Sequence, residues 1–259
     1  MELIRAFGVQ QRVISALIMR EVVSRYANNK LGFFWALFEP FAHVVVFMGI
    51  FTAMGRHSPV GDNIGLFILT GIIPWLLYNN VVSSVMNAVN ANKALLGYPQ
   101  VMPLDIVLAR VLLDFATLLI VMLIFLGLFI SLGTKIRIDD FLLLMNIAGL
   151  LVLAGLGMGL LNTAIIYYAP SWGNIYKAIT QPLYFMSGIF YTADFLSPDV
   201  YNIVAYNPLL HIIDWFRTAF FKEYESQLID YNYALAFSIG TFSLGLLVER
   251  LTRKRARIK

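Results

Sequence analysis

The sequence FLLLMNIAGLLVLAGLGMGLLNTAIIYY, residues 141–168, contains no charged side chain. A helix of roughly 20 apolar residues crosses the hydrocarbon core of a bilayer, which is about 30 Å thick. The apolar residues do not alternate with polar ones, which favours a helix over a strand of a membrane barrel. The stretch therefore predicts a transmembrane helix. Within it, Gly155 and Gly159 form a G-x-x-x-G pattern that predicts close helix packing.

Similar stretches lie on both sides of this one. Charge-free runs occupy residues 63–92, 115–134 and 231–248, and the chain of 259 residues is 59% hydrophobic but only 13% charged. A soluble domain averages about 25% charged residues. We therefore predict an all-α polytopic membrane protein, forming one transmembrane domain over residues 1–259. Its six predicted spans are 33–54, 65–88, 106–132, 141–168, 175–192 and 232–250.

The basic residues predict the orientation. With both termini inside, fourteen of the 19 lysines and arginines lie on the cytosolic side, including those of the tail at 251–259. The outer side keeps only Arg56, Lys135, Arg137, Arg217 and Lys222. The positive-inside rule therefore predicts that both termini are cytoplasmic. Because this topology accounts for the net charge of +4, we expect contacts with membrane lipids and no nucleic-acid partner.

Residues 1–31, which precede the first span, have an amphipathic pattern whose basic side chains include Arg20, Arg25 and Lys30. Such a helix is expected to lie in the membrane interface, with its apolar face in lipid and its arginines toward the headgroups. A lipid anchor and a helix that docks a partner protein fit the pattern equally well.

Residues 194–231 are too polar for a simple span and too apolar for a free loop. Apolar residues follow Asn207-Pro208, and a proline favours the first turn of a helix. We expect one or two short amphipathic helices on the outer side, and the sequence leaves open whether they enter the membrane; an ordinary extracytoplasmic loop is the alternative.

Motifs for catalysis and cofactor binding are missing. The sequence has no G-x-x-x-x-G-K-[ST] or G-x-G-x-x-G phosphate-binding loop and no H-E-x-x-H metal motif. His43, His57 and His211 are too scattered to propose a metal site, and no Ser/His/Asp set is selected by spacing. We therefore expect no catalytic residue, no metal and no bound cofactor on this chain.

Ionisable residues close to a span are costly and usually face the interior of a bundle. Asp114 lies one turn after Arg110, so we expect a local ion pair at the cytosolic end of the third span. We expect Glu39 and Pro40 to open the first transmembrane helix, with the carboxylate at its N-terminus.

Aromatic residues are dense near predicted span ends, where an interfacial belt is the usual explanation. Trp75, Tyr78 and Tyr184 instead fall within spans, and His43 lies just inside the first one. We interpret these four residues as candidates for lining a conduit, because amphipathic rings suit sugars. For His43, a hydrogen-bonded interior group is the alternative.

The segment NANKALLGYPQVMPLD, residues 90–105, separates the second and third predicted spans on the cytosolic side. Its prolines disfavour helix at Tyr98 and Met102, the residues that precede them. We expect a cytosolic elbow with room for one short helix at 90–97.

Several motifs together carry a resemblance. Residues 20–43, REVVSRYANNKLGFFWALFEPFAH, contain Gly32, Trp35, Glu39 and Pro40 in a Leu-Gly-aromatic-aromatic-Trp-Ala pattern that leads into Glu-Pro. The further matches are GIIPW at 71–75, ALLGYPQVMPLDIVLARVLLD at 94–114, QPLYFMSGIFY at 181–191 and YNPLLHIIDWFR at 206–217. This ordered set, which covers nearly the whole chain, resembles permeases of polysaccharide-exporting ABC transporters, above all the capsular polysaccharide export branch.

The resemblance implies a homodimer joined to two copies of a separate ATPase, which uses ATP and Mg²⁺. It implies that the elbow is a coupling helix for that ATPase, through Asn90, Lys93, Leu96, Tyr98, Pro99, Pro103 and Asp105. It also implies that the outer helices gate the exit, and our candidate residues there are Tyr206, Asn207, Pro208, His211, Trp215 and Arg217.

The implied function is export of a lipid-linked capsular polysaccharide across a bacterial inner membrane, with a periplasmic co-polymerase and outer-membrane export proteins as partners. Related permeases export O-antigens or teichoic acids. A membrane enzyme acting on a lipid-linked sugar is an alternative, but the sequence lacks the clustered acidic or metal motif that it needs. A secondary transporter would show inverted repeats, which we do not find.

Overall fold

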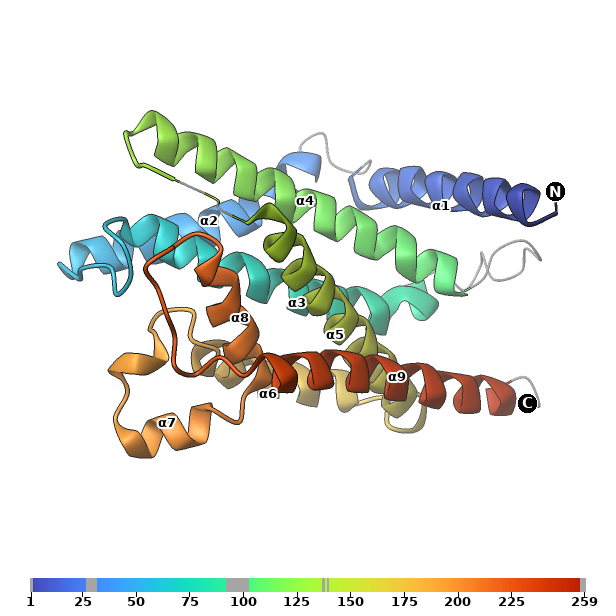
Figure 1. The fold of residues 1–259 in the computed structure, drawn as a ribbon. Helices are drawn as coiled ribbons and strands as arrows, with labels where there is room; N and C mark the ends of the chain where they lie inside the picture. Colours follow the sequence, from blue (N-terminus) through green and yellow to red (C-terminus); the bar gives the residue numbers. More distant parts are fainter. Residues whose placement is uncertain (1, 27–31, 92–102, 137, 139, 257–259) are drawn as a thin grey trace.

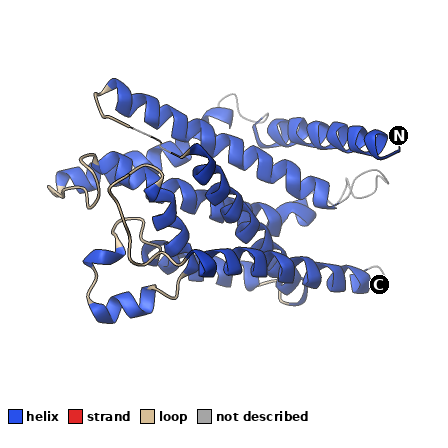
Figure 2. Ribbon diagram, in the orientation of Figure 1, coloured by secondary structure: helices blue, strands red, loops and turns tan. Residues whose placement is uncertain are grey.

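The computed structural model describes residues 2–26, 32–91, 103–136, 138 and 140–256, and this part of the chain contains helices but no strand (Figure 2). Figure 1 shows their arrangement. The helices are α1 Glu2–Tyr26, α2 Gly32–Ala53, α3 Ile64–Ala91, α4 Pro103–Ser131, α5 Phe141–Tyr168, α6 Trp172–Met186, the 3₁₀ turn η2 Ala193–Phe195, α7 Pro198–Val204, α8 Pro208–Thr218 and α9 Tyr231–Ala256.

Four of these helices are long and apolar enough to cross a membrane: Ile64–Ala88, Leu104–Ser131, Phe141–Tyr168 and Tyr231–Thr252. They coincide with four of the predicted spans. The apolar part of α2, Leu37–Ala53, is shorter. Helix α6 has 15 residues and is therefore about 22 Å long, less than the thickness of the hydrocarbon core.

The fifth predicted span, 175–192, is thus wrong as a continuous helix at its C-terminal end. Helix α6 ends at Met186, and Gly188 has a φ of 70°, a backbone conformation that ends a helix and that glycine adopts most easily. A side chain at residue 188 would also collide with Leu210 of α8, because an added Cβ would lie 2.3 Å from its Cδ1 atom. The chain therefore turns back here toward α8.

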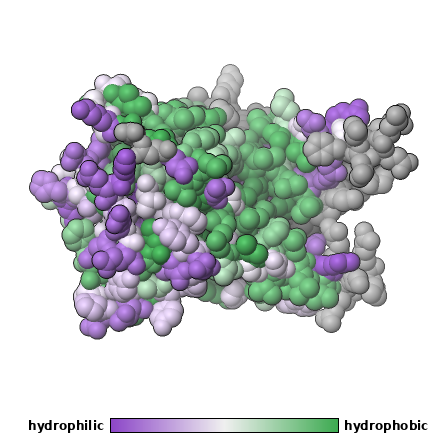
Figure 3. Space-filling model, viewed as in Figure 1, coloured by the Kyte–Doolittle hydropathy of each residue, from purple (hydrophilic) through white to green (hydrophobic). Residues whose placement is uncertain are grey.

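The surface is divided into an apolar middle and polar ends. Figure 3 shows a broad hydrophobic zone over the helices, with hydrophilic residues gathered mainly at the end where α7 and the α2–α3 connection lie. The opposite end holds α1, the end of α3, the start of α4 and the end of α9 (Figure 1). Both ends of the described chain therefore lie at the same end of the bundle.

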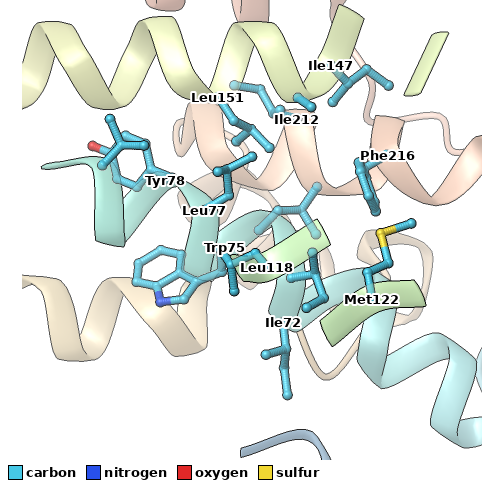
Figure 4. Close-up of a cluster of buried hydrophobic side chains, with 14 of the residues drawn as sticks. Ile72, Trp75, Leu77, Tyr78, Leu118, Met122, Ile147, Leu151, Ile212 and Phe216 are labelled. Atoms are coloured by element: carbon cyan, nitrogen blue, oxygen red, sulfur yellow. The ribbon is translucent and has the colours of Figure 1, made fainter. Parts of the chain in front are cut away.

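Helix α3 lies at the centre of the fold. It packs against α2, α4, α5 and α8. Figure 4 shows one buried cluster in which side chains from α3, α4, α5 and α8 interlock: Ile72, Leu77, Leu118, Met122, Ile147, Leu151, Ile212 and Phe216. Because lipid tails are as apolar as these side chains, close van der Waals packing is what holds the helices together where they meet.

Glycines of α5 let two neighbouring helices approach closely, which confirms the predicted packing role. Added Cβ atoms at Gly155 and Gly159 would lie 2.8 Å and 2.5 Å from side chains of α3. Gly157 faces α9, where an added Cβ would lie 2.3 Å from the backbone nitrogen of Phe242. Gly155 and Gly159 therefore allow α5 to pack closely on α3, and Gly157 allows it to pack closely on α9 of the same chain.

The prediction that Glu39 and Pro40 open the first transmembrane helix is wrong. Helix α2 begins at Gly32 and continues through Pro40. Aromatic contacts support the early turns, since the rings of Phe34 and Phe38 stack with centroids 5.3 Å apart. A proline inside a helix removes one backbone hydrogen bond, and membrane helices tolerate this loss more readily.

Candidate functional site

Helix α8 carries one stripe of buried polar side chains toward the end of the bundle that holds α7 (Figure 1), and we call this end the outer end. Asn207, His211, Asp214 and Arg217 are spaced by three or four residues, so they share one face of the helix, and none is more than 7% exposed. We call this set the α8 polar stripe. The proline that starts the helix, Pro208, occupies the position that the sequence predicted.

Arg217 is completely buried, and both Nη atoms of its guanidinium donate hydrogen bonds, whereas its Nε–H has no hydrogen-bond partner among the described residues. Nη2 donates a hydrogen bond to the carbonyl of Ile189 at 2.9 Å, and Nη1 donates to the carbonyl of Tyr191 at 3.4 Å and to Asp214 Oδ1 at 3.1 Å. The Cζ atom lies 4.2 Å from the ring centroid of Phe67 on α3, a cation–π distance. These contacts compensate for placing a charge in the interior.

Asp214 connects this arginine to the segment that follows α8. Its Oδ2 atom accepts a hydrogen bond from the hydroxyl of Ser226 at 2.9 Å, while Oδ1 accepts from Arg217. Burial raises the pKa of Asp214 and lowers the pKa of Arg217, and the charge of each partner opposes the shift of the other. The pair is therefore stable as an ion pair only while both members remain in place.

Asn207 caps α8 and ties it to the end of α6. Its Oδ1 atom accepts from the backbone amide of Leu209 at 3.1 Å, the arrangement of an N-cap. Its Nδ2 atom donates to the carbonyl of Met186 at 3.2 Å and to the hydroxyl of Ser187 at 2.9 Å. One side chain therefore fixes both the start of α8 and the turn after α6.

His211 joins α8 to the start of α9. Its Nδ1 atom accepts from the backbone amide of Asp230 at 3.1 Å, so a neutral ring carries its proton on Nε2. That nitrogen lies 2.8 Å from the carbonyl of Ala205, to which it donates. Both ring nitrogens are used in structural hydrogen bonds.

The other two predicted gate residues lie nearer the surface. The side chain of Tyr206 is 82% exposed, although its carbonyl accepts from the hydroxyl of Tyr233 at 2.7 Å. Trp215 is half-buried and meets the ring of Tyr231 edge-on, with centroids 4.8 Å apart. Of the predicted gate residues, Tyr206 is thus exposed, whereas Asn207, His211 and Arg217 belong to the buried α8 polar stripe.

The four candidate conduit residues come together in one cluster. His43 Nε2 lies 2.6 Å from the hydroxyl of Tyr184, and the ring of Tyr184 meets that of Trp75 edge-on at 5.4 Å. The ring of Trp75 lies 6.3 Å from that of Tyr78, and Figure 4 shows both on α3. Trp75 and Tyr78 are at most 3% exposed, whereas His43 is half-buried.

Sequence reasoning missed other members of this aromatic region. Phe47 and Phe190 pack against each other at 4.5 Å, and Phe190 also meets Tyr184 at 5.5 Å. The indole of Trp172 donates to Asn162 Oδ1 at 2.8 Å. The four-residue repeat of Trp172, Tyr176, Thr180 and Tyr184 along α6 is the signal that could have identified this face.

Polar contacts join α1, α3 and α4 at the opposite end. Asp105 is buried and accepts from the amide of Gln10 on α1. Arg110 Nε lies 3.0 Å from Glu21 Oε1, also on α1. Asp114 accepts from the hydroxyl of Ser84 on α3. The expected pairing of Arg110 with Asp114 is therefore replaced by contacts that join different helices.

The remaining predicted residues of this end are only partly described. Arg20 is exposed on α1, Asn90 belongs to the last turn of α3, and Pro103 begins α4. Trp35 and Glu39 are exposed and Pro40 is buried on α2, whose first residue is Gly32. Lys30, Lys93, Leu96, Tyr98 and Pro99, most of the expected short helix at 90–97 and the side chain of Arg25 lie outside the described residues.

Within the described ranges, no group of three or more His, Cys, Asp or Glu side chains has an arrangement that could hold a metal ion. The site consists of an aromatic cluster in the apolar zone, the α8 polar stripe at one end and the α1–α4 contacts at the other. Such an arrangement of long apolar helices with polar contacts at both ends is that of a polytopic membrane protein.

Comparison with known proteins agrees with that class. The ABC-2 type transporter family matches residues 12–221, and the chain belongs to this family. The polysialic acid transport protein KpsM of Escherichia coli is 29% identical over 97% of both chains. The capsule polysaccharide export inner-membrane protein CtrC of Neisseria meningitidis is 30% identical over 88% of this chain and 84% of its own. The O-antigen export system permease protein RfbA of Myxococcus xanthus is 28% identical over 42% of each chain.

Proposed function

We propose that this chain is the inner-membrane permease subunit of an ATP-driven exporter that moves a lipid-linked capsular polysaccharide from the cytoplasm to the periplasm. The observation that carries the proposal is the similarity to KpsM over 97% of both chains, since it includes the aromatic cluster, the outer helices and the elbow together. Export of an O-antigen is the second candidate, favoured by the shorter match to RfbA.

In the proposed topology, α2, α3, α4, α5, α6 and α9 are the six spans, and both termini are cytoplasmic. The placement of α1, the start of α4 and the end of α9 at one end of the bundle supports this arrangement (Figure 1). Helix α1 lies near the cytosolic membrane surface, and α7 and α8 form the gate region at the periplasmic end. The chain functions as a homodimer.

The proposed source of energy is a separate ATPase, present in two copies, which binds ATP and Mg²⁺. Residues 90–105 form its docking segment, because this segment connects the end of α3 to the start of α4, and both of these helix ends lie at the end of the bundle that carries α1 (Figure 1). Asp105 supports this role, since its contact with Gln10 links the start of α4 directly to α1. A periplasmic co-polymerase and outer-membrane export proteins receive the polymer.

The proposed conduit is lined by His43, Trp75, Tyr78 and Tyr184 after the bundle opens. In the closed state, the hydroxyl of Tyr184 hydrogen-bonds to His43 instead of to a sugar. Opening would exchange this internal hydrogen bond for bonds to polymer hydroxyls, with ring faces packing against the sugar C–H groups. The polar groups therefore remain paired in both states.

The proposal is tested in cells that lack their own copy of this gene. Expression of the chain with its ATPase should restore surface polysaccharide and remove the cytoplasmic pool, and replacement of residues 98–105 by a Gly/Ser linker should abolish export. Turnover of a lipid-linked sugar by the purified chain alone would instead establish the enzyme alternative. Unchanged export with the linker would exclude the docking role of the elbow.

A further inference from the structure

The turn after α6 and helix α8 form one packed unit. Asn207 holds the carbonyl of Met186, and Arg217 holds the carbonyls of Ile189 and Tyr191. Leu210 fills the space above Gly188. We call residues 186–217 the outer hairpin. Its two halves are joined by side chains that bind backbone atoms, so the halves cannot slide past each other without leaving buried polar groups unpaired.

The same arginine attaches this unit to α3. Phe67 lies under the guanidinium, and Gly71 lies one turn further along the same face of α3. An added Cβ at Gly71 would lie 2.8 Å from Arg217 Nη2 and 2.7 Å from the carbonyl oxygen of Ile189. The absence of a side chain at this position is therefore what allows the charged group and the turn to reach the helix.

We infer that Arg217 is a positioning residue that joins the outer hairpin to α3, so that the two move as one body during transport. The inference rests on the proposed function, because α3 ends at Ala91, directly before the proposed ATPase docking segment. A displacement of that segment then reaches the outer end through a single helix. Opening of the exit takes place between this body and its neighbours, and the contact of α8 with α3 is kept throughout.

The test uses the complete complex of permease and ATPase and three variants. Arg217→Gln removes the charge, Arg217→Lys keeps it but loses the planar fork that reaches two carbonyls and Asp214 together, and Lys222→Gln removes a charge from an exposed residue nearby. Export is measured as surface polysaccharide per permease in the membrane, and ATP hydrolysis is measured on the purified complex.

We expect Arg217→Gln to lower export at least tenfold while the complex still assembles and hydrolyses ATP, and Lys222→Gln to behave as wild type. Arg217→Lys should recover only part of the export. Full recovery by lysine would show that the charge alone matters, and equal loss of assembly and export in Arg217→Gln would show a purely structural role. Either result overturns the inference.

Hydrogen exchange on the same complexes tests the single body directly. Amides of residues 187–195 and of α8 should stay protected in both the nucleotide-free and the ATP-bound wild type, and should exchange at least tenfold faster in Arg217→Gln. Loss of protection in wild type on ATP binding would contradict the inference. If wild type itself restores no export, the proposed function fails, and this measurement still decides whether α3 and the outer hairpin stay joined.

Discussion

The two ends of the bundle each contain an ion pair, and the two pairs differ in kind. The side chains of Arg217 and Asp214 are both 0% exposed, whereas those of Arg110 and Glu21 are 12% and 7% exposed. Arg217 also binds two carbonyls and an aromatic ring. The Nε–H of each arginine lacks a hydrogen-bond partner within the described part of the chain, so the two pairs differ in burial and in these further contacts of Arg217.

This difference indicates different mechanical roles. The outer pair lies within one helix and is surrounded by further contacts, so it has a single arrangement. The inner pair connects α1 to α4 and is slightly more exposed than the outer pair, so we expect it to be exchanged at a smaller cost. We therefore expect the outer end to transmit motion as a fixed unit and the inner end to adjust.

The largest expected effect comes from removing the counter-ion of the outer pair. Asp214→Ala leaves Arg217 buried without its carboxylate, so we expect a loss of about 3–5 kcal/mol in the stability of the purified complex, measured by thermal unfolding. The matched change at the inner end, Glu21→Ala, should cost clearly less. Equal losses would remove the distinction between the two ends.

A second prediction concerns Gly71, the residue of α3 against which the guanidinium of Arg217 packs. Gly71→Ala should destabilise the protein by about 1–3 kcal/mol, because the added methyl overlaps the carbonyl of Ile189 and the guanidinium of Arg217. Gly149→Ala on α5 is the control, since nothing lies within 4 Å of the added Cβ, and alanine favours a helix. A neutral Gly71→Ala would show that the outer end is less tightly packed than described.

The inner pair is tested by a double-mutant cycle with Glu21→Gln and Arg110→Gln. We expect a coupling energy of about 1 kcal/mol. The amount of polysaccharide exported per ATP hydrolysed should change more than the stability does, because this pair connects α1 with α4. If a matched cycle on Asp214 and Arg217 gave an equal coupling energy, the inner pair would be no easier to exchange than the outer pair, contrary to this prediction.

The smallest effect on stability is expected in the aromatic cluster, which lies between the two ends of the bundle. Tyr184→Phe removes the hydrogen bond to His43 and should cost about 0.5 kcal/mol in thermal unfolding. Export should slow noticeably, since the hydroxyl is proposed to contact the polymer. Unchanged export at wild-type permease levels would exclude Tyr184 from the conduit.

Helix positions were predictable because apolar runs, and the prolines or glycines that begin or end helices, are local features of the sequence. The runs at 141–168 and 231–248 match α5 and α9, and Pro208 begins α8 as expected. The partner of Arg110 was not predictable, because spacing shows only neighbours within one helix, and Glu21 comes from a distant helix. The bounds of α2 agree with the predicted span 33–54, but the proposed helix start at Glu39 and Pro40 was wrong, because a membrane helix can continue through a proline.

The candidate site was predictable in its residue types but less so in its contacts. Aromatic residues inside spans identified His43, Trp75, Tyr78 and Tyr184, which do come together. The inward direction of the α8 polar stripe depends on carbonyls of residues 186–191, and a backbone atom has no signature in the sequence. Tertiary packing alone decides which polar face of a short helix is buried.

The position of Asp214 relative to Arg217 has a consequence for biogenesis. In the proposed orientation, Arg217 is one of the few basic residues that must be carried to the outer side, against the tendency that sets topology. Asp214 is synthesised three residues earlier and lies on the same helical face. The nascent helix can therefore pair its own charges as soon as it forms, before Ser226 and α9 have been made, which lowers the barrier to translocating the arginine.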